Sequence, residues 1–223
     1  MTTRRDMMGW LIAGGAVALL AGCGRGSSRK LRYKITLEAG TSGGVKTGAS
    51  VLETDINQNG FTLGQSPYVD LGQGQFAFAL LNNMKSISKK SMLGTVMRAL
   101  KYPDLKPQSL DQSRDLFDQA KDYKSRAVLR REDYPMLVTF GDTNNPKTVR
   151  ELDPSAVTRI TFQVVDQAEP LTEGIEGLLK WIGPYPETAL MPLSPNTGLE
   201  SVKDAPLPRL LSNCDFVFRG NGR

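Results

Sequence analysis

The chain has 223 residues, with 28 basic and 23 acidic side chains, a net charge of +5 and no histidine. Its length suffices for one domain with a sizeable core, and the mild charge does not suggest a nucleic-acid partner. Without histidine, a Ser-His-Asp triad, a Cys-His pair and imidazole-ligated zinc are all excluded.

The first 22 residues have the pattern of an export signal peptide. Arg4 and Arg5 precede an uncharged stretch from Met7 to Gly22. That stretch is too short and too rich in glycine to span a membrane, which takes about 20 mostly apolar residues. The paired arginines also resemble a twin-arginine signal, although such pairs occur in ordinary signals too. Both export routes therefore stay open.

Leu20-Ala21-Gly22-Cys23 closely resembles the lipobox of bacterial lipoproteins. The resemblance implies cleavage before Cys23, a diacylglyceryl thioether on its sulfur and an acylated amine. Two or three acyl chains anchor a protein to the bilayer stably. Because Gly24 rather than aspartate follows, the resemblance implies an outer-membrane lipoprotein facing the periplasm. The alternatives are an uncleaved amino-terminal anchor and a secreted protein with an ordinary thiol.

The rest of the chain is expected to form one α+β domain. Residues 23–30 form a lipidated tether, residues 31–183 the domain, and residues 184–223 a proline-rich arm and a terminal strand packed on it. Residues 40–48 are expected to be a turn-rich link between the first two strands. Period-2 alternation and apolar runs predict strands at residues 31–38, 49–54, 68–71, 76–81, 136–140 and 160–164, with 147–152 returning antiparallel.

Helical signals fall in three places. Residues 89–102 carry a helical apolar face that ends at Pro103, and Ser109 with Gln112 forms a capping box for a second helix. A third helix is predicted at residues 172–182, although Gly174 and Gly177 weaken it. The pattern predicts a mainly antiparallel, sandwich-like sheet with an inserted helical block and a proline-rich carboxyl-terminal arm.

The second cysteine, Cys214, has no partner for a disulfide if Cys23 is lipidated. Residues 183–208 hold six prolines and are expected to be extended. In the terminal strand, predicted at residues 215–219, alternation places Cys214 on one face with Phe216 and Phe218. We therefore expect Cys214 to be buried as a small apolar side chain.

Asp55, Asn57 and Asn59, followed by Gly60, match the first half of a calcium-binding EF-hand loop. The twelfth position holds Ser66 instead of the bidentate glutamate, and the preceding residues have a strand pattern. A hairpin turn at Asn59-Gly60 is the preferred interpretation. No other metal site and no cofactor site is predicted.

Other motif matches fit their chemistry poorly. In residues 40–48, Val45 separates the last glycine from Lys46, unlike a phosphate-binding loop. Ser86 and Lys89 match the Ser-x-x-Lys pattern of serine acyltransferases, but the Lys-Thr-Gly element at 46–48 precedes it, in reversed order. The helical block carries carboxylates interleaved with basic residues, as a solvated face does.

Five segments resemble a group of small bacterial proteins without an assigned activity: residues 32–38, 45–53, 134–140, 145–149 and 159–164. That resemblance brings no functional residues to this chain. The sequence therefore favours an envelope lipoprotein bound to the bilayer through Cys23 and acting as a binding, assembly or structural component with an envelope protein partner. An envelope hydrolase using serine and lysine or paired carboxylates, and a small-ligand carrier, are the alternatives.

Overall fold

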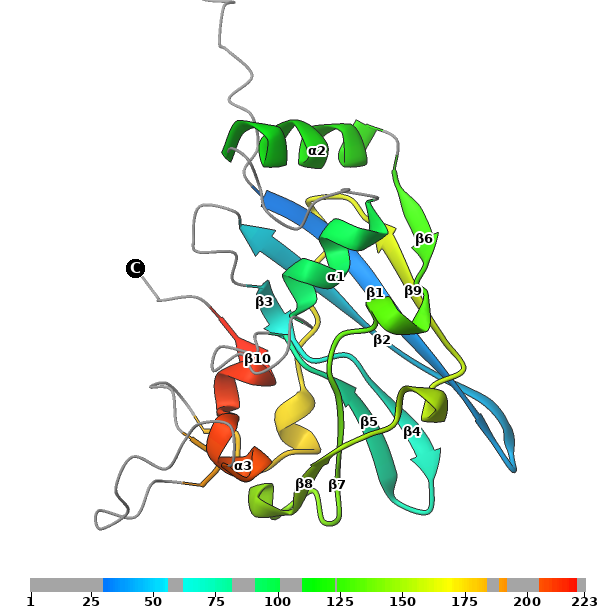
Figure 1. Ribbon diagram of the computed structural model, residues 1–223, viewed down its shortest axis with the longest axis vertical. Helices are drawn as coiled ribbons and strands as arrows, with labels where there is room; N and C mark the ends of the chain where they lie inside the picture. Colours follow the sequence, from blue (N-terminus) through cyan, green and yellow to red (C-terminus); the bar gives the residue numbers. More distant parts are fainter. Residues whose placement is uncertain are drawn as a thin grey trace, which may run out of the picture.

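Two antiparallel β-sheets packed against each other form the molecule (Figure 1). The computed structural model describes residues 30–55, 62–81, 91–100, 110–122, 124–183, 189–191 and 205–219. The larger sheet has the strand order β10-β3-β2-β1-β9-β6, and the smaller has the order β4-β5-β7-β8. The predicted class, a mainly antiparallel α+β sandwich, is confirmed.

The larger sheet contains β1 (Lys30–Thr41), β2 (Gly44–Asp55), β3 (Thr62–Gln65), β6 (Arg126–Val128), β9 (Arg159–Val164) and β10 (Val217–Phe218). The smaller sheet contains β4 (Tyr68–Gly72), β5 (Gln75–Ala79), β7 (Leu137–Phe140) and β8 (Val149–Glu151). The helices are α1 (Met92–Ala99), α2 (Leu110–Asp122) and α3 (Leu207–Leu210).

Strand β1 lies near the centre of the larger sheet, and its sequence alternation explains its orientation. Its odd-numbered side chains from Leu31 to Ala39 are fully buried in a core shared with the smaller sheet, α1 and α2. Its even-numbered side chains lie on the opposite face, which we call the outer face of the larger sheet. The register pairs Ile35 with Phe162 of β9 and with Ser50 of β2.

The two central strands of the smaller sheet, β5 and β7, are buried on both faces over most of their length, which explains their nearly continuous apolar sequences. Ala77 and Ala79 of β5 face the first core. Phe78 faces a second core, made with segments that follow β9 and with residues near the carboxyl terminus. Its ring packs against Phe140 and Phe216, with ring centroids 5.5 and 6.0 Å away.

Residues 40–48 are not the turn-rich link that their glycines suggested. β1 and β2 stay paired up to Thr41 and Gly44, so only Ser42 and Gly43 form the turn. Gly44 has a φ of +105°, a conformation that glycine adopts without strain. The paired backbone overrides the low strand propensity of the glycines. Beyond Glu38 the pairing of β9 with β1 ends, and residues 39–48 form a two-stranded arm (Figure 1).

The predicted helix at residues 172–182 is wrong. Only a 3-10 turn forms, at Ile175–Gly177, and Gly174 before it has a φ of +105°. Ile175, Leu179 and Ile182 are nevertheless buried in the second core. The apolar spacing thus reports burial, whereas the two glycines prevent a continuous helix.

The other two helical predictions are confirmed for the residues that the structure describes. Ser91 caps α1, its side chain accepting a hydrogen bond from the Gly94 amide at 3.2 Å. In α2, Phe117 and Ala120 face the first core. The proposed cap Ser109 lies outside the described residues.

The carboxyl-terminal prediction is partly wrong. Cys214 is buried, with 3% of its surface exposed, but it lies in a 3-10 turn at Asn213–Asp215. The turn is held by the Ser212 amide, which donates to the Asp215 carboxylate at 2.8 Å. It disrupts strand alternation, so Cys214 faces the first core and Phe216 the second. Most of the proline-rich arm lies outside the described residues.

Candidate functional site

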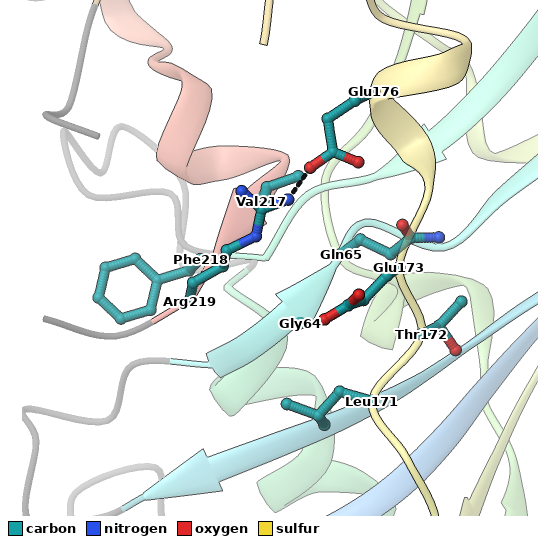
Figure 2. A pocket seen from close by; sticks show the side chains of 9 residues that line it. All are labelled: Gly64, Gln65, Leu171, Thr172, Glu173, Glu176, Val217, Phe218 and Arg219. Atoms are coloured by element: carbon teal, nitrogen blue, oxygen red, sulfur yellow. Dashed lines mark hydrogen bonds and ion pairs between the residues drawn. The ribbon is translucent and has the colours of Figure 1, made fainter. Parts of the chain in front are cut away.

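A cavity of about 160 Å³ lies between β3, β10 and residues 171–176 (Figure 2). Leu171, Val217 and Phe218 supply its apolar wall. Its polar lining comes from Gln65, Thr172, Glu173, Glu176 and Arg219. These residues come from three distant segments that meet at one end of the larger sheet.

The strand edges explain why residues 171–176 lie here. Thr172 forms hydrogen bonds with the edge of β2 like those that a neighbouring strand would form. Its amide donates to the Val51 carbonyl at 3.2 Å, and its hydroxyl accepts from the Val51 amide at 2.8 Å. The side-chain oxygen of Gln65 accepts a hydrogen bond from the Ile175 amide at 2.8 Å. The polar atoms of Gln65 and Thr172 that make these contacts therefore hold the chain in place.

Gly64 brings β3 close to β2 at the edge of the cavity. Its φ is +115°, and a Cβ there would lie 2.9 Å from the Cδ2 atom of Leu52. Both observations require glycine at this position. Across the cavity, Glu176 and Arg219 form an ion pair between half-exposed side chains, drawn as a dashed line in Figure 2.

This geometry offers little for catalysis. Serine, lysine and cysteine are absent from the residues that line the cavity, so it presents no serine-lysine pair. Arg219 neutralises Glu176, which leaves Glu173 as the one lining carboxylate without an ion pair to another described residue. The volume is also below the 300 to 1,000 Å³ or so of ordinary ligand pockets. The cavity could hold only a ligand of a few atoms.

A second, more open cavity of about 300 Å³ lies between the end of α1, α2 and the start of β6. Leu100 and Leu116 contribute apolar surface, and Arg126 and Gln119 lie at its exposed side. Like the first cavity it is lined without a lysine, and unlike the first it is also lined without a carboxylate. Neither cavity has the deep apolar interior that a small-ligand carrier requires.

The structure does not place most of the residues singled out from the sequence. Cys23, Asn57, Asn59, Ser86 and Lys89 lie outside the described residues. Asp55 is buried at the end of β2, with 6% of its surface exposed. β2 and β3 pair antiparallel on either side of residues 56–61, as a hairpin requires.

Lys46 and most carboxylates of the helical block are solvated, as predicted, but Asp133 is not. It is 7% exposed and pairs with Arg98 at 3.0 Å, which corrects the prediction of a wholly solvated face. Lys46 is exposed on the β1–β2 arm and lines neither cavity. Asp115 and Asp122 are exposed on α2. Asp118 pairs with Lys121 at 3.7 Å, and partial burial lowers the pKa of Lys121 while Asp118 opposes that shift. Over the described ranges, no group of three or more Cys, Asp or Glu side chains is arranged to hold a metal ion.

Gln65, Glu176 and Arg219 belong to no motif, so no pattern in the sequence pointed to them. Comparison with protein-family models, curated proteins and solved structures found no match to the chain. Within the described part of the chain, no helix is long and apolar enough to cross a membrane.

Proposed function

We propose that this protein is a lipid-anchored component of the bacterial envelope that binds or assembles with another envelope protein. The observation that carries the proposal is Leu20-Ala21-Gly22-Cys23 at the end of a short apolar stretch. Acylation of Cys23 would attach the domain to the periplasmic side of the outer membrane, and more than one acyl chain would make the attachment stable.

The position of the first strand supports a domain that works close to the bilayer. β1 begins at Lys30, seven Cα steps after Cys23. At about 3.4 Å per step the tether reaches about 24 Å when fully extended. A partner of the anchored domain is therefore expected among proteins of the same membrane or those that approach its surface.

Two features favour binding over catalysis. The chain has no histidine, and the lining of the two cavities offers no pair of nucleophile and base. The polar atoms that Gln65 and Thr172 direct to the backbone are already engaged in holding the fold. A protein that works by binding a partner at its surface does not need free polar groups inside these cavities.

Metabolic labelling with an alkyne fatty acid tests the anchor. Wild-type chain and a Cys214→Ala variant should both carry the label and remain in the membrane fraction. A Cys23→Ala variant should lose the label and leave the outer-membrane fraction of a density gradient. An unlabelled wild-type chain, or equal membrane retention of Cys23→Ala, would contradict the proposal.

Cross-linking in intact cells tests the binding role separately. The anchored wild-type chain should give a discrete adduct with an envelope protein, and the yield should fall in Cys23→Ala because the domain is no longer held beside its partner. If the labelled, correctly located chain forms no adduct with another envelope protein, the anchor stands and the binding role does not.

A further inference from the structure

Along the arm, the edge of β2 from Val45 to Ala49 has no hydrogen-bonding partner among the described residues. In β2, the backbone N–H and C=O groups of Val51 point away from β1, because both bond to Thr172. Successive residues of a strand alternate in this direction. The backbone groups of Val45, Thr47 and Ala49 therefore point the same way, and none of them has a partner among the described residues.

This edge is open to solvent. Val45 is 69% exposed, one of two large apolar side chains with high exposure in the described part of the chain, and Thr47 and Ala49 are exposed too. β3 pairs with β2 only at Glu53 and Thr54, well beyond this stretch. Figure 1 shows the arm extending past the neighbouring strands. Such an edge is a template for another strand.

We propose that a second copy of this chain pairs with the β2 edge from Val45 to Ala49, antiparallel and about a two-fold axis at Thr47. Thr47 then lies opposite Thr47 of the second copy, and Val45 opposite its Ala49. Each of these opposed pairs exchanges two backbone hydrogen bonds. The two larger sheets become one continuous sheet.

The side chains fit this self-pairing. Apolar Val45 meets apolar Ala49, and the central threonines pair favourably across the strands. Lys46, the charged residue of this stretch, lies opposite Gly48, so like charges do not face each other. Moving the axis by one residue toward the amino terminus would place Lys46 opposite Lys46, which is unfavourable.

The length of the paired stretch is also limited at its carboxyl-terminal end on β2. Thr172 occupies the edge of β2 at Val51, where an added strand must stop. In the proposed register, Gly43 of the second copy comes opposite Val51. A residue without a side chain leaves the most room beside Thr172. The paired stretch is short, and its interface falls below the roughly 1,600 Å² of a standard stable complex. Covalent trapping is therefore the appropriate test.

The test uses the full chain in its membrane, with Thr47→Cys oxidised and analysed on a non-reducing gel. The two introduced cysteines would have Cα atoms about 5.5 Å apart, within disulfide range. Val128→Cys is the matched control, because Val128 is 62% exposed on the opposite edge strand of the same sheet. Wild-type chain gives the background from Cys214, the free thiol that remains when Cys23 is acylated. We expect a dimer band for Thr47→Cys well above both.

Charge changes test the register in the Thr47→Cys background. Val45→Lys with Ala49→Lys sets lysine opposite lysine twice, and should lower the dimer yield about tenfold. Val45→Lys with Ala49→Glu sets opposite charges together and should restore it. Both double variants alter exposed positions, so a folding defect would affect them alike and would also lower thermal stability.

Three results would overturn the proposal. One is a Thr47→Cys dimer yield no higher than that of Val128→Cys or wild type. Another is trapping of a different protein in place of a second copy, which would assign the edge to a foreign strand. The third is equal yield in the two double variants, which would exclude this register. Failure of this dimer test does not contradict the proposed lipid anchor, because the anchor is tested separately by fatty-acid labelling.

Discussion

The carbonyl oxygen of Tyr68 occupies the position that a Cβ atom on Gly48 would take. At this point β4 of the smaller sheet crosses β2 of the larger one. The side-chain hydrogen of Gly48 is what lets the two backbones come so close. This contact fixes how near the sheets lie to each other, and with it the thickness of the first core.

Gly48→Ala should lower the free energy of unfolding by about 2 kcal/mol or more, because the added methyl group must push two backbone segments apart. Urea denaturation measures the change. Gly40→Ala is the control: a Cβ there meets no atom within 4 Å, and its φ is not in the left-handed region. Equal stability of the two variants would show that the crossing can relax.

Glu53→Gln should destabilise the fold far more than Glu38→Gln. Glu53 is 4% exposed and pairs with Arg32 at 2.7 Å and with Lys30 at 3.1 Å. Arg32 also donates to the carbonyls of Gln167 and Glu169, each at 2.6 Å. Loss of the carboxylate leaves Arg32 partly buried without its ionic partner, at a cost on the order of 3 kcal/mol.

Glu38 is the matched control for Glu53, because it too pairs with an arginine on the outer face of the larger sheet. Its partner Arg159 has 53% of its side chain exposed, and such exposed pairs contribute about 1 kcal/mol or less. Thermal or urea unfolding of both variants, at low and high salt, compares them. A larger loss for Glu38→Gln would contradict the assignment.

Tyr33 should make the fold sensitive to alkaline pH. Burial raises the pKa of Tyr33 to about 12, although hydrogen bonding to Thr54 opposes the shift. The folded chain holds this proton more tightly than the unfolded chain, where the pKa is about 10. Its contribution is therefore complete below about pH 10 and is lost as pH rises toward 12, by roughly 2 to 3 kcal/mol.

Tyr33→Phe isolates that effect. At neutral pH it should cost about 1 kcal/mol, because the 2.9 Å hydrogen bond between the Tyr33 and Thr54 hydroxyls is lost. The stability difference from wild type should then shrink or reverse above pH 10. A constant difference, measured by urea unfolding across this range, would show that Tyr33 does not titrate with unfolding.

Asp133→Ala should loosen α1. The carboxylate of Asp133 pairs with Arg98 of α1 at 3.0 Å and accepts from Arg130 at 2.8 Å, while its backbone carbonyl accepts from the Thr95 hydroxyl at 3.1 Å. Removing the carboxylate leaves the partly buried Arg98 without this ionic partner, at a cost on the order of 2 kcal/mol.

Amide hydrogen exchange should show that loss mainly in α1. Glu132→Gln is the control, because Glu132 pairs with Arg130 through two largely exposed side chains. Exchange in β1 should change little in either variant. Unchanged protection of α1 in Asp133→Ala would mean that the apolar contacts of Met92 and Val96 hold the helix by themselves.

The sequence predicted the parts of the fold that local pattern controls. The unbroken alternation in β1 gave both the strand and its buried face, and the apolar spacing of α1 gave a helix. β3 and β6 were not predicted, because Thr62–Gln65 and Arg126–Val128 are too short to show a period. Their partners in distant strands determine them.

The candidate site was beyond prediction for a related reason. Gln65, Glu176 and Arg219 meet only because β3, the segment after β9 and β10 converge, and none has a motif around it. Residues 172–182 show the same limit in the opposite way, because here a local pattern predicted an element that does not form. Their apolar spacing is real, but it serves burial against Phe78 and its neighbours and not a helix.

The bonds near the carboxyl terminus set a constraint on when the fold can close. The Phe216 carbonyl accepts from the Ser66 amide at 2.7 Å, and the Asp215 carbonyl accepts from the Leu81 amide at 2.9 Å. Segments synthesised early in translation therefore cannot complete these hydrogen bonds until residues more than a hundred positions later have been synthesised. Such long-range pairing slows folding. The nascent chain therefore keeps its aromatic second core open until residue 216 has emerged, and it is exposed to proteases and chaperones for that time.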